Sequence, residues 1–267
     1  MLHLLKIDLK KLLDYRTFWI ICGLYFFTLI VGAASGMEFL KWLSNLIEGF
    51  GESININRIP LYHFPDIWQN LLWSSGLLKL GIGIMVVISI SNEFTYRTIR
   101  QNIIDGLSRK EFLYSKMLTN FVLSFSSMLI VFLIASITGL IYSPSLDFPY
   151  GFTGMDFCIA YFLEVFAFLS FSLMLGIMIQ RSGLTIILLL FAFLIEFIIK
   201  ANLDDYIPDF IQFFPLESIS NLVPFPFKRY WFSEIRDHVS LISLAVASFW
   251  TFLFNYFSYL KLKNSDI

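Results

Sequence analysis

The segment SNEFTYRTIRQNIIDGLSRKEFLYSKM, from Ser91 to Met117, is a compact polar stretch between two long apolar runs. Its charged residues are Arg97, Arg100, Arg109, Lys110 and Lys116 together with Glu93, Asp105 and Glu111. Each flanking run can cross the hydrocarbon core of a bilayer, which takes about 20 helical residues. The segment therefore predicts two membrane spans joined by an ordered polar connection.

The composition of the whole chain agrees with a membrane protein. Of its 267 residues, 57% are hydrophobic and only 15% are charged, against about 25% charged residues in ordinary soluble proteins. A soluble fold of this size could not hide so much apolar surface. The net charge of −1 gives no reason to expect a nucleic-acid partner. Cys22 and Cys158 both fall in apolar segments and are expected to be buried thiols without a disulfide.

Six apolar segments predict an all-α integral membrane protein whose single transmembrane domain covers residues 1–267. The predicted spans are 17–36, 68–91, 117–142, 157–179, 184–199 and 239–260. The fifth is the shortest and could be bent or incomplete. A cleavable signal peptide is the alternative for the first, because Ala33-Ala34-Ser35 resembles a cleavage site. The apolar stretch is longer than the ~7–15 residues of a signal core, which favours a span.

The distribution of Lys and Arg predicts the orientation of the chain. With the N-terminus inside, the inner connections carry twelve Lys and Arg and the outer ones six. This excess predicts a protein of the cell (inner) membrane with both termini in the cytoplasm. Residues 1–16 have leucines at helical spacing, at Leu2, Leu5, Leu9 and Leu12. They predict a helix lying at the lipid headgroups, and a plain cytoplasmic leader is the alternative. The proline-rich, aromatic region 200–238 predicts short external helices.

The opening segment has the pattern of a short helix over 92–107. Its apolar stripe consists of Tyr96, Ile99, Ile103 and Leu107, and its polar face of Arg97, Arg100, Gln101 and Asp105. Gly106 offers a left-handed helix stop. Ser108 and Glu111 have the spacing of a capping box for the next helix. A basic loop that only sets the topology would not need this pattern, so a docking surface is the favoured interpretation.

The run Glu93…Arg97-Thr98…Arg100…Gly106-Leu107-Ser108-Arg109…Phe112-Leu113…Lys116 resembles the permease subunits of type-2 ABC transporters, in the bacterial exporter class. The resemblance implies that 92–107 is a coupling helix that fits a groove on a separate ATP-hydrolysing subunit. The site residues it implies are Glu93, Arg97, Thr98, Arg100, Gly106, Ser108 and Arg109. It also implies a substrate path formed as a dimer with a second permease copy or a paralogue, in contact with membrane lipid.

No phosphate-binding loop of the form G-x-x-x-x-G-K-[ST] occurs in the sequence. ATP and Mg²⁺ are therefore expected on the partner ATPase, with no cofactor and no metal on this chain. HExxH, Cys-x-x-Cys and G-x-S-x-G motifs are also absent, so we expect no catalytic residue and no enzyme. A membrane scaffold or accessory subunit without a transport path is the main alternative function, and an intramembrane hydrolase is a weaker one.

Two charged residues are predicted to lie inside the membrane. Lys79 is about 20 Å from Asn92, and Glu164 is about 24 Å from Gln180, at 1.5 Å per helical residue. Their similar depths would allow them to pair. Intramembrane charges are costly and often functional, so the pair could belong to a transport path or could be a structural ion pair.

Overall fold

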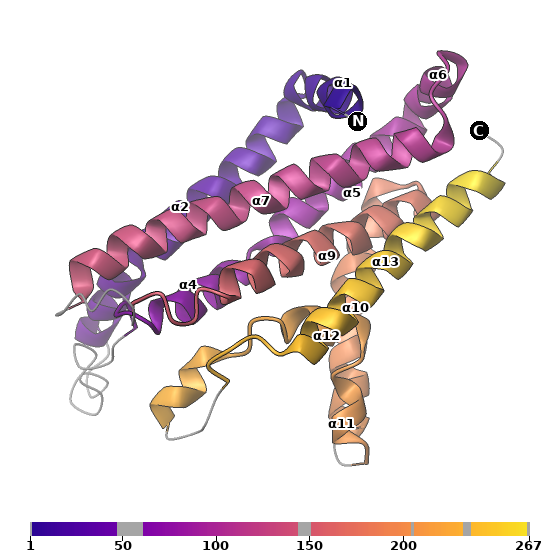
Figure 1. Ribbon diagram of the computed structural model, residues 1–267. Helices are drawn as coiled ribbons and strands as arrows, with labels where there is room; N and C mark the ends of the chain where they lie inside the picture. Colours follow the sequence, from indigo (N-terminus) through magenta and orange to yellow (C-terminus); the bar gives the residue numbers. More distant parts are fainter. Residues whose placement is uncertain (1, 47–60, 144–150, 204–205, 232–235, 266–267) are drawn as a thin grey trace.

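A computed structural model describes residues 2–46, 61–143, 151–203, 206–231 and 236–265 (Figure 1). Within these ranges the chain is helical and contains no strand. Six helical segments are long and apolar enough to cross a membrane. The predicted all-α, multi-pass membrane fold is thereby confirmed.

The spans are α2 (Arg16–Leu46), α4 with α5 (Ile67–Gly76 and Lys79–Thr95), α7 (Arg109–Tyr142), α9 (Phe157–Ile179), α10 (Ser182–Leu203) and α13 (Leu241–Asn264). The shorter helices are α1 (Leu2–Leu13), α6 (Thr98–Ile104), α11 (Pro208–Ile211), α12 (Pro215–Ser220) and the 3-10 helix η2 (Pro226–Trp231). The last three lie in the region 200–238, of which 204–205 and 232–235 are outside the described residues.

Several helices extend beyond the apolar segments that predicted them. Helix α7 begins at Arg109 instead of Met117, and α10 runs to Leu203. The expectation that the fifth span is incomplete was wrong, because α10 is continuous. Hydropathy marks only the part of a helix that matches the hydrocarbon core, whereas backbone hydrogen bonding continues into polar residues.

The second span is interrupted between α4 and α5. Around the junction, backbone N–H groups donate to the carbonyl three residues earlier. Leu78 N donates to Ser75 O at 3.1 Å, and Gly81 N donates to Leu78 O at 3.0 Å. This tighter, 3-10-like spacing keeps the backbone groups hydrogen-bonded across the interruption. Lys79 is the first residue of α5, so one intramembrane charge lies directly at the interruption.

Helix α9 is the centre of the bundle. It contacts α4, α5, α7, α10, α12 and α13, and 67% of its apolar window is buried, against 11% for α10. Glycines allow α5 and α9 to approach closely. A Cβ atom at Gly83 would lie 2.6 Å from the Phe168 ring, and one at Gly176 would lie 2.2 Å from Ile90. Close packing through small residues is a common way for membrane helices to associate.

Both chain ends and α6 lie at the same end of the bundle. Figure 1 shows α6 and the N- and C-termini together at the upper right. Two contacts agree with this arrangement: Lys11 Nζ of α1 donates to Asn102 Oδ1 of α6 at 2.9 Å, and Arg109 Nη1 of α7 donates to Leu262 O near the end of α13 at 2.7 Å.

Candidate functional site

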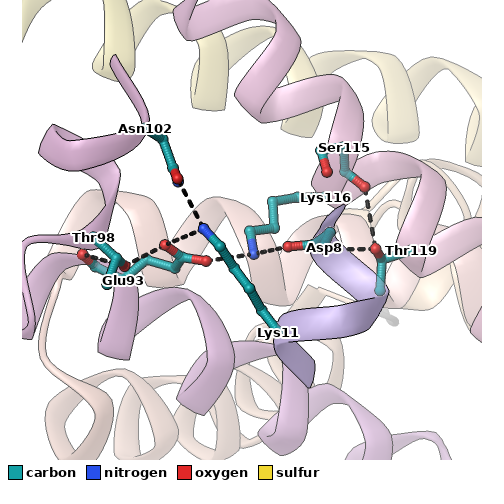
Figure 2. Close-up of polar contacts among 8 residues, drawn as sticks. All are labelled: Asp8, Lys11, Glu93, Thr98, Asn102, Ser115, Lys116 and Thr119. Carbon is teal, nitrogen blue, oxygen red and sulfur yellow. Dashed lines mark hydrogen bonds and ion pairs between the residues drawn. The ribbon is translucent and has the colours of Figure 1, made fainter. Parts of the chain in front are cut away.

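A buried network of charges joins α1, α5, α6 and α7 at the end of the bundle that carries α6 (Figure 2). Lys116 of α7 is its centre. The Lys116 ammonium bonds Oδ1 of Asp8 from α1, and it donates to Glu93 Oε1 from α5 at 3.0 Å. Thr119, one turn further along α7, donates to the second oxygen of Asp8 at 2.6 Å. One lysine therefore holds the N-terminal helix and the end of span two against span three.

The same network reaches the short helix α6. The Thr98 hydroxyl, at the start of α6, bonds Glu93 Oε2 and lies 3.3 Å from Glu93 O. Lys11 approaches from the opposite side, with its Nζ 3.9 Å from Glu93 Oε2 and 2.9 Å from Asn102 Oδ1. Glu93 of α5 thus bonds or pairs with residues of α1, α6 and α7.

The charges of the network balance. Asp8, Glu93 and Lys116 are only 3%, 7% and 5% exposed, and together they carry one excess negative charge. Lys11, whose side chain is 39% exposed, supplies the compensating positive charge from the rim. Buried charges are tolerated when they are paired and hydrogen-bonded, and removing one partner is strongly destabilising. The network therefore fixes the relative positions of four helices.

The backbone separates α6 sharply from its two neighbours. Arg97 adopts a left-handed conformation with φ of 57°, which ends α5 and starts α6. Gly106 has φ of +98°. The N–H of Leu107 bonds Asn102 O, and the N–H of Gly106 bonds Ile103 O. This is the Schellman pattern of helix termination, so the predicted glycine stop is confirmed.

Ser108 and Arg109 fix the start of α7 and hold it against α13. The Ser108 hydroxyl accepts from Glu111 N, while the Glu111 carboxylate accepts from Ser108 N at 2.8 Å, which confirms the predicted capping box. The Arg109 guanidinium donates to the carbonyls of Leu262 and Lys263, at 2.7 and 2.5 Å. A cation at these carbonyls neutralises the negative end of the α13 dipole.

Two arginine side chains at α6 point outward and make no such contact with the described part of the chain. Arg97 and Arg100 are exposed, and neither makes an ion pair within the described residues. Ile99 is buried on the opposite face, and Ile103 packs against the core. Tyr96 was predicted to belong to this apolar stripe, but it is 69% exposed, because the left-handed turn at Arg97 takes it out of the helical register of α6.

The seven residues implied by the resemblance fall into two groups. Glu93, Thr98, Gly106, Ser108 and Arg109 hold α6 and its flanking turns in place, whereas Arg97 and Arg100 present charge to the outside. The predicted helix 92–107 is also shorter in the structure. Glu93 belongs to α5, and α6 covers only Thr98–Ile104, since the left-handed residue Arg97 divides the pattern in two.

The sequence analysis did not name Lys11, Lys116 and Thr119 as site residues. It missed Asp8 as well. A signal for it exists, because Asp8 lies at helical spacing from Leu5 and Leu12 and hence on the apolar face of α1. A carboxylate on a buried face requires a partner. Nothing in the sequence identifies Lys116 as that partner, since the two residues are 108 positions apart.

The structure brings the two intramembrane charges together. Lys79 Nζ lies 2.5 Å from Glu164 Oε1, and both side chains are buried. The Glu164 carboxylate packs against Gly76, where a Cβ atom would lie 2.9 Å from Oε1. Its Oε2 atom has no hydrogen-bond donor among the described residues. This tight packing is typical of an ion pair that fixes α9 against the interruption of span two.

A second polar group lies one turn from Glu164 along α9. The hydroxyl of Tyr161 lies 2.8 Å from Ser127 Oγ of α7, which lies 2.6 Å from the Tyr25 hydroxyl of α2. The three hydroxyls satisfy one another inside the apolar core and connect α2, α7 and α9. Such interhelical hydrogen bonds contribute roughly 0.6–2 kcal/mol each in membranes.

The fold and its six apolar helices define the chain as a multi-pass, all-helical membrane protein. A match to a family model places the chain in a smaller group within this class. The family described as "Protein of unknown function (DUF2705)" matches residues 56–267, and the chain belongs to this family. The match begins before α4 and includes every helix from α4 to α13, with Glu93, Lys116 and all of α6. Comparison with curated proteins finds no match.

Proposed function

We propose that this chain is the permease subunit of a type-2 ABC transporter of the bacterial exporter class, and that α6 is its contact with a separate ATPase subunit. The observation that carries the proposal is the form of α6. It is a short helix with exposed arginines, Arg97 and Arg100, held by a buried charge network to the two spans it connects.

The network gives a physical route from α6 into the membrane. A force on α6 would act on Glu93 through Thr98, and so on α5 in span two. It would also act on Lys116 in α7 and, through Lys116, on Asp8 in α1. Because separating buried ion pairs costs several kcal/mol, these helices should move together. Binding and hydrolysis of ATP on the partner could then change access to a path between two permease copies.

The proposed arrangement places the protein in the inner membrane with both termini in the cytoplasm. The excess of Lys and Arg in the connections at the α6 end supports this orientation. The partners are an ABC ATPase that carries ATP and Mg²⁺, and a second permease copy or paralogue. The exposed apolar side chains of α10 are available to lipid or to that second copy.

Purification of the tagged chain from native membranes tests this function. The proposal expects a stoichiometric partner that carries a phosphate-binding loop and hydrolyses ATP. A complex that reproducibly lacks any ATPase, from membranes in which an ABC ATPase is expressed beside this chain, would favour the alternative of a scaffold or accessory subunit.

A further inference from the structure

A polar cavity lies at the end of the bundle opposite α6. Its volume is about 470 Å³, within the ~300–1,000 Å³ that is usual for small-molecule sites. Asp66 and Gln69 contribute from the start of span two, Thr153 and Phe157 from the start of α9, and Arg229 and Asp237 from the segment before α13. Three parts of the chain that are distant in sequence therefore meet around one space.

Two hydrogen-bond acceptors in this cavity have no donor among the described residues. Gln69 is only 4% exposed and lines the cavity. Its Nε2 donates to Pro224 O at 3.2 Å, but no described residue donates to its Oε1. Asp66 Oδ1 accepts from Arg229, and within the described chain Oδ2 receives no hydrogen bond. These two oxygens can therefore accept hydrogen bonds from N–H or O–H groups of a ligand in the cavity.

The described charged residues that line the cavity carry more negative than positive charge. Arg229 lies between Asp66 and Asp237 and pairs with both, so these three described residues carry one net negative charge. His238 lines the rim and lies 3.8 Å from a further carboxylate, Asp156. Burial raises the pKa of Asp66, although the Arg229 charge opposes this shift. A second positive charge in the cavity would stabilise the ionised form of Asp66.

We propose that this cavity binds the primary ammonium group of a small molecule. An ammonium group has three N–H donors and one positive charge, which matches the donor-free acceptors and the excess of carboxylate. The apolar ring of Phe157 at the same cavity can contact the methylene part of such a ligand. A metal ion fits less well, because the described residues do not bring three metal-binding side chains together here. A carboxylate ligand would be repelled by Asp66 and Asp237.

Isothermal titration calorimetry of the full chain in detergent micelles tests the site with putrescine as the probe. Butanediol and succinate serve as the neutral and the anionic analogue of similar length. The expected result is that putrescine binds and that both analogues bind at least about tenfold more weakly, since a charge-assisted hydrogen bond is lost. The ATPase plays no part in this measurement, so its outcome is independent of the proposed transport function.

Variants distinguish a ligand site from a purely structural ion-pair cluster. Asp66→Asn and Asp237→Asn should each weaken putrescine binding about tenfold, whereas Arg229→Gln should strengthen it by removing the competing cation. The Asp237 side chain is 70% exposed, so its variant should fold even if Asp66→Asn does not. Glu217→Gln, which breaks the Lys200 ion pair outside the cavity, should leave the affinity unchanged.

Three results would overturn the proposal. These are the absence of measurable putrescine binding, equal binding of butanediol or succinate, and unchanged affinity in Asp237→Asn. A loss of affinity in Arg229→Gln as large as that in Asp66→Asn, with both proteins folded, would assign these residues to a structural cluster instead.

Discussion

Lys116 Nζ of span three lies 3.0 Å from Glu93 Oε1 of span two, close to the end of α5 and just before α6 begins. The same ammonium bonds Asp8 of α1. The ends of two spans and the N-terminal helix are thus fixed around one buried positive charge, and α6 is attached to this point through Thr98.

Removal of the Lys116 charge should destabilise the protein strongly. Lys116→Met leaves Asp8 and Glu93 as buried carboxylates without their common partner, and we expect a loss of about 3–5 kcal/mol in the free energy of unfolding. Lys10→Met is the control, because Lys10 is exposed on α1 and its loss should cost less than about 1 kcal/mol. Thermal unfolding in detergent measures both. Equal transition temperatures for the two variants would contradict the network's structural role.

Lys79 and Glu164 should show strong coupling in a double-mutant cycle. Lys79→Met alone leaves a buried carboxylate and is expected to cost about 3–5 kcal/mol, whereas adding Glu164→Gln should recover a large part of this loss. The pair Lys200–Glu217, with side chains 39% and 23% exposed, is the matched control and should couple by less than about 1 kcal/mol. Additive effects at Lys79 and Glu164 would show that the buried pair contributes nothing as a pair.

Gly106 is expected to tolerate substitution poorly for a backbone reason. No heavy atom lies within 4 Å of a Cβ atom built at Gly106, but its φ is +98°. Gly106→Val should therefore cost about 1–2 kcal/mol through strain alone, and Gly106→Asn should cost less, because Asn adopts left-handed conformations more readily. Comparison of thermal unfolding for the two variants checks this order. A Val variant as stable as the parent would mean that the turn can rearrange.

The proposed topology predicts opposite accessibility for two exposed sites. Single cysteines would replace Gln101 on α6 and Tyr206 after α10, in a background without the buried Cys22 and Cys158. A membrane-impermeant maleimide added to intact cells should label the cysteine at 206 and should reach the one at 101 only after the membrane is opened. Labelling of both positions in intact cells would refute the orientation.

Local sequence patterns predicted local structure well. The glycine stop at Gly106 and the capping box of Ser108 with Glu111 follow from short-range backbone chemistry, so they could be derived from neighbouring residues. The rise per helical residue also predicted that Lys79 and Glu164 lie at similar depths in the membrane. The left-handed residue Arg97 could not be predicted, because it is not the glycine that usually adopts this conformation. Gly76 directly precedes the interruption at Leu77–Leu78, but a single glycine in an apolar segment does not by itself predict a break.

Sequence analysis could not predict the charge network, for a different reason. Asp8, Glu93 and Lys116 lie on three helices, and their contacts depend on how those helices pack. A single sequence shows that a charge on an apolar face needs a partner, but it does not show which one. Glu93 was consequently assigned to the predicted helix 92–107, whereas it lies in α5 and is buried.

We propose that Arg97, directly before α6, and Arg100, within it, transmit the action of an ATPase to the bundle. The most direct measurement is the ATPase activity of the complex in membranes, together with recovery of the ATPase on the tagged chain, for Arg97→Glu/Arg100→Glu. Lys261→Glu/Lys263→Glu is the matched control, because these exposed lysines lie at the same end of the bundle on α13 and the change in charge is identical. Like charges placed at an interface cost several kcal/mol. We expect the arginine variant to insert normally but to lose ATPase binding or the coupling of hydrolysis, while the lysine variant behaves as the parent. An arginine variant that binds the ATPase and couples hydrolysis like the parent would contradict it.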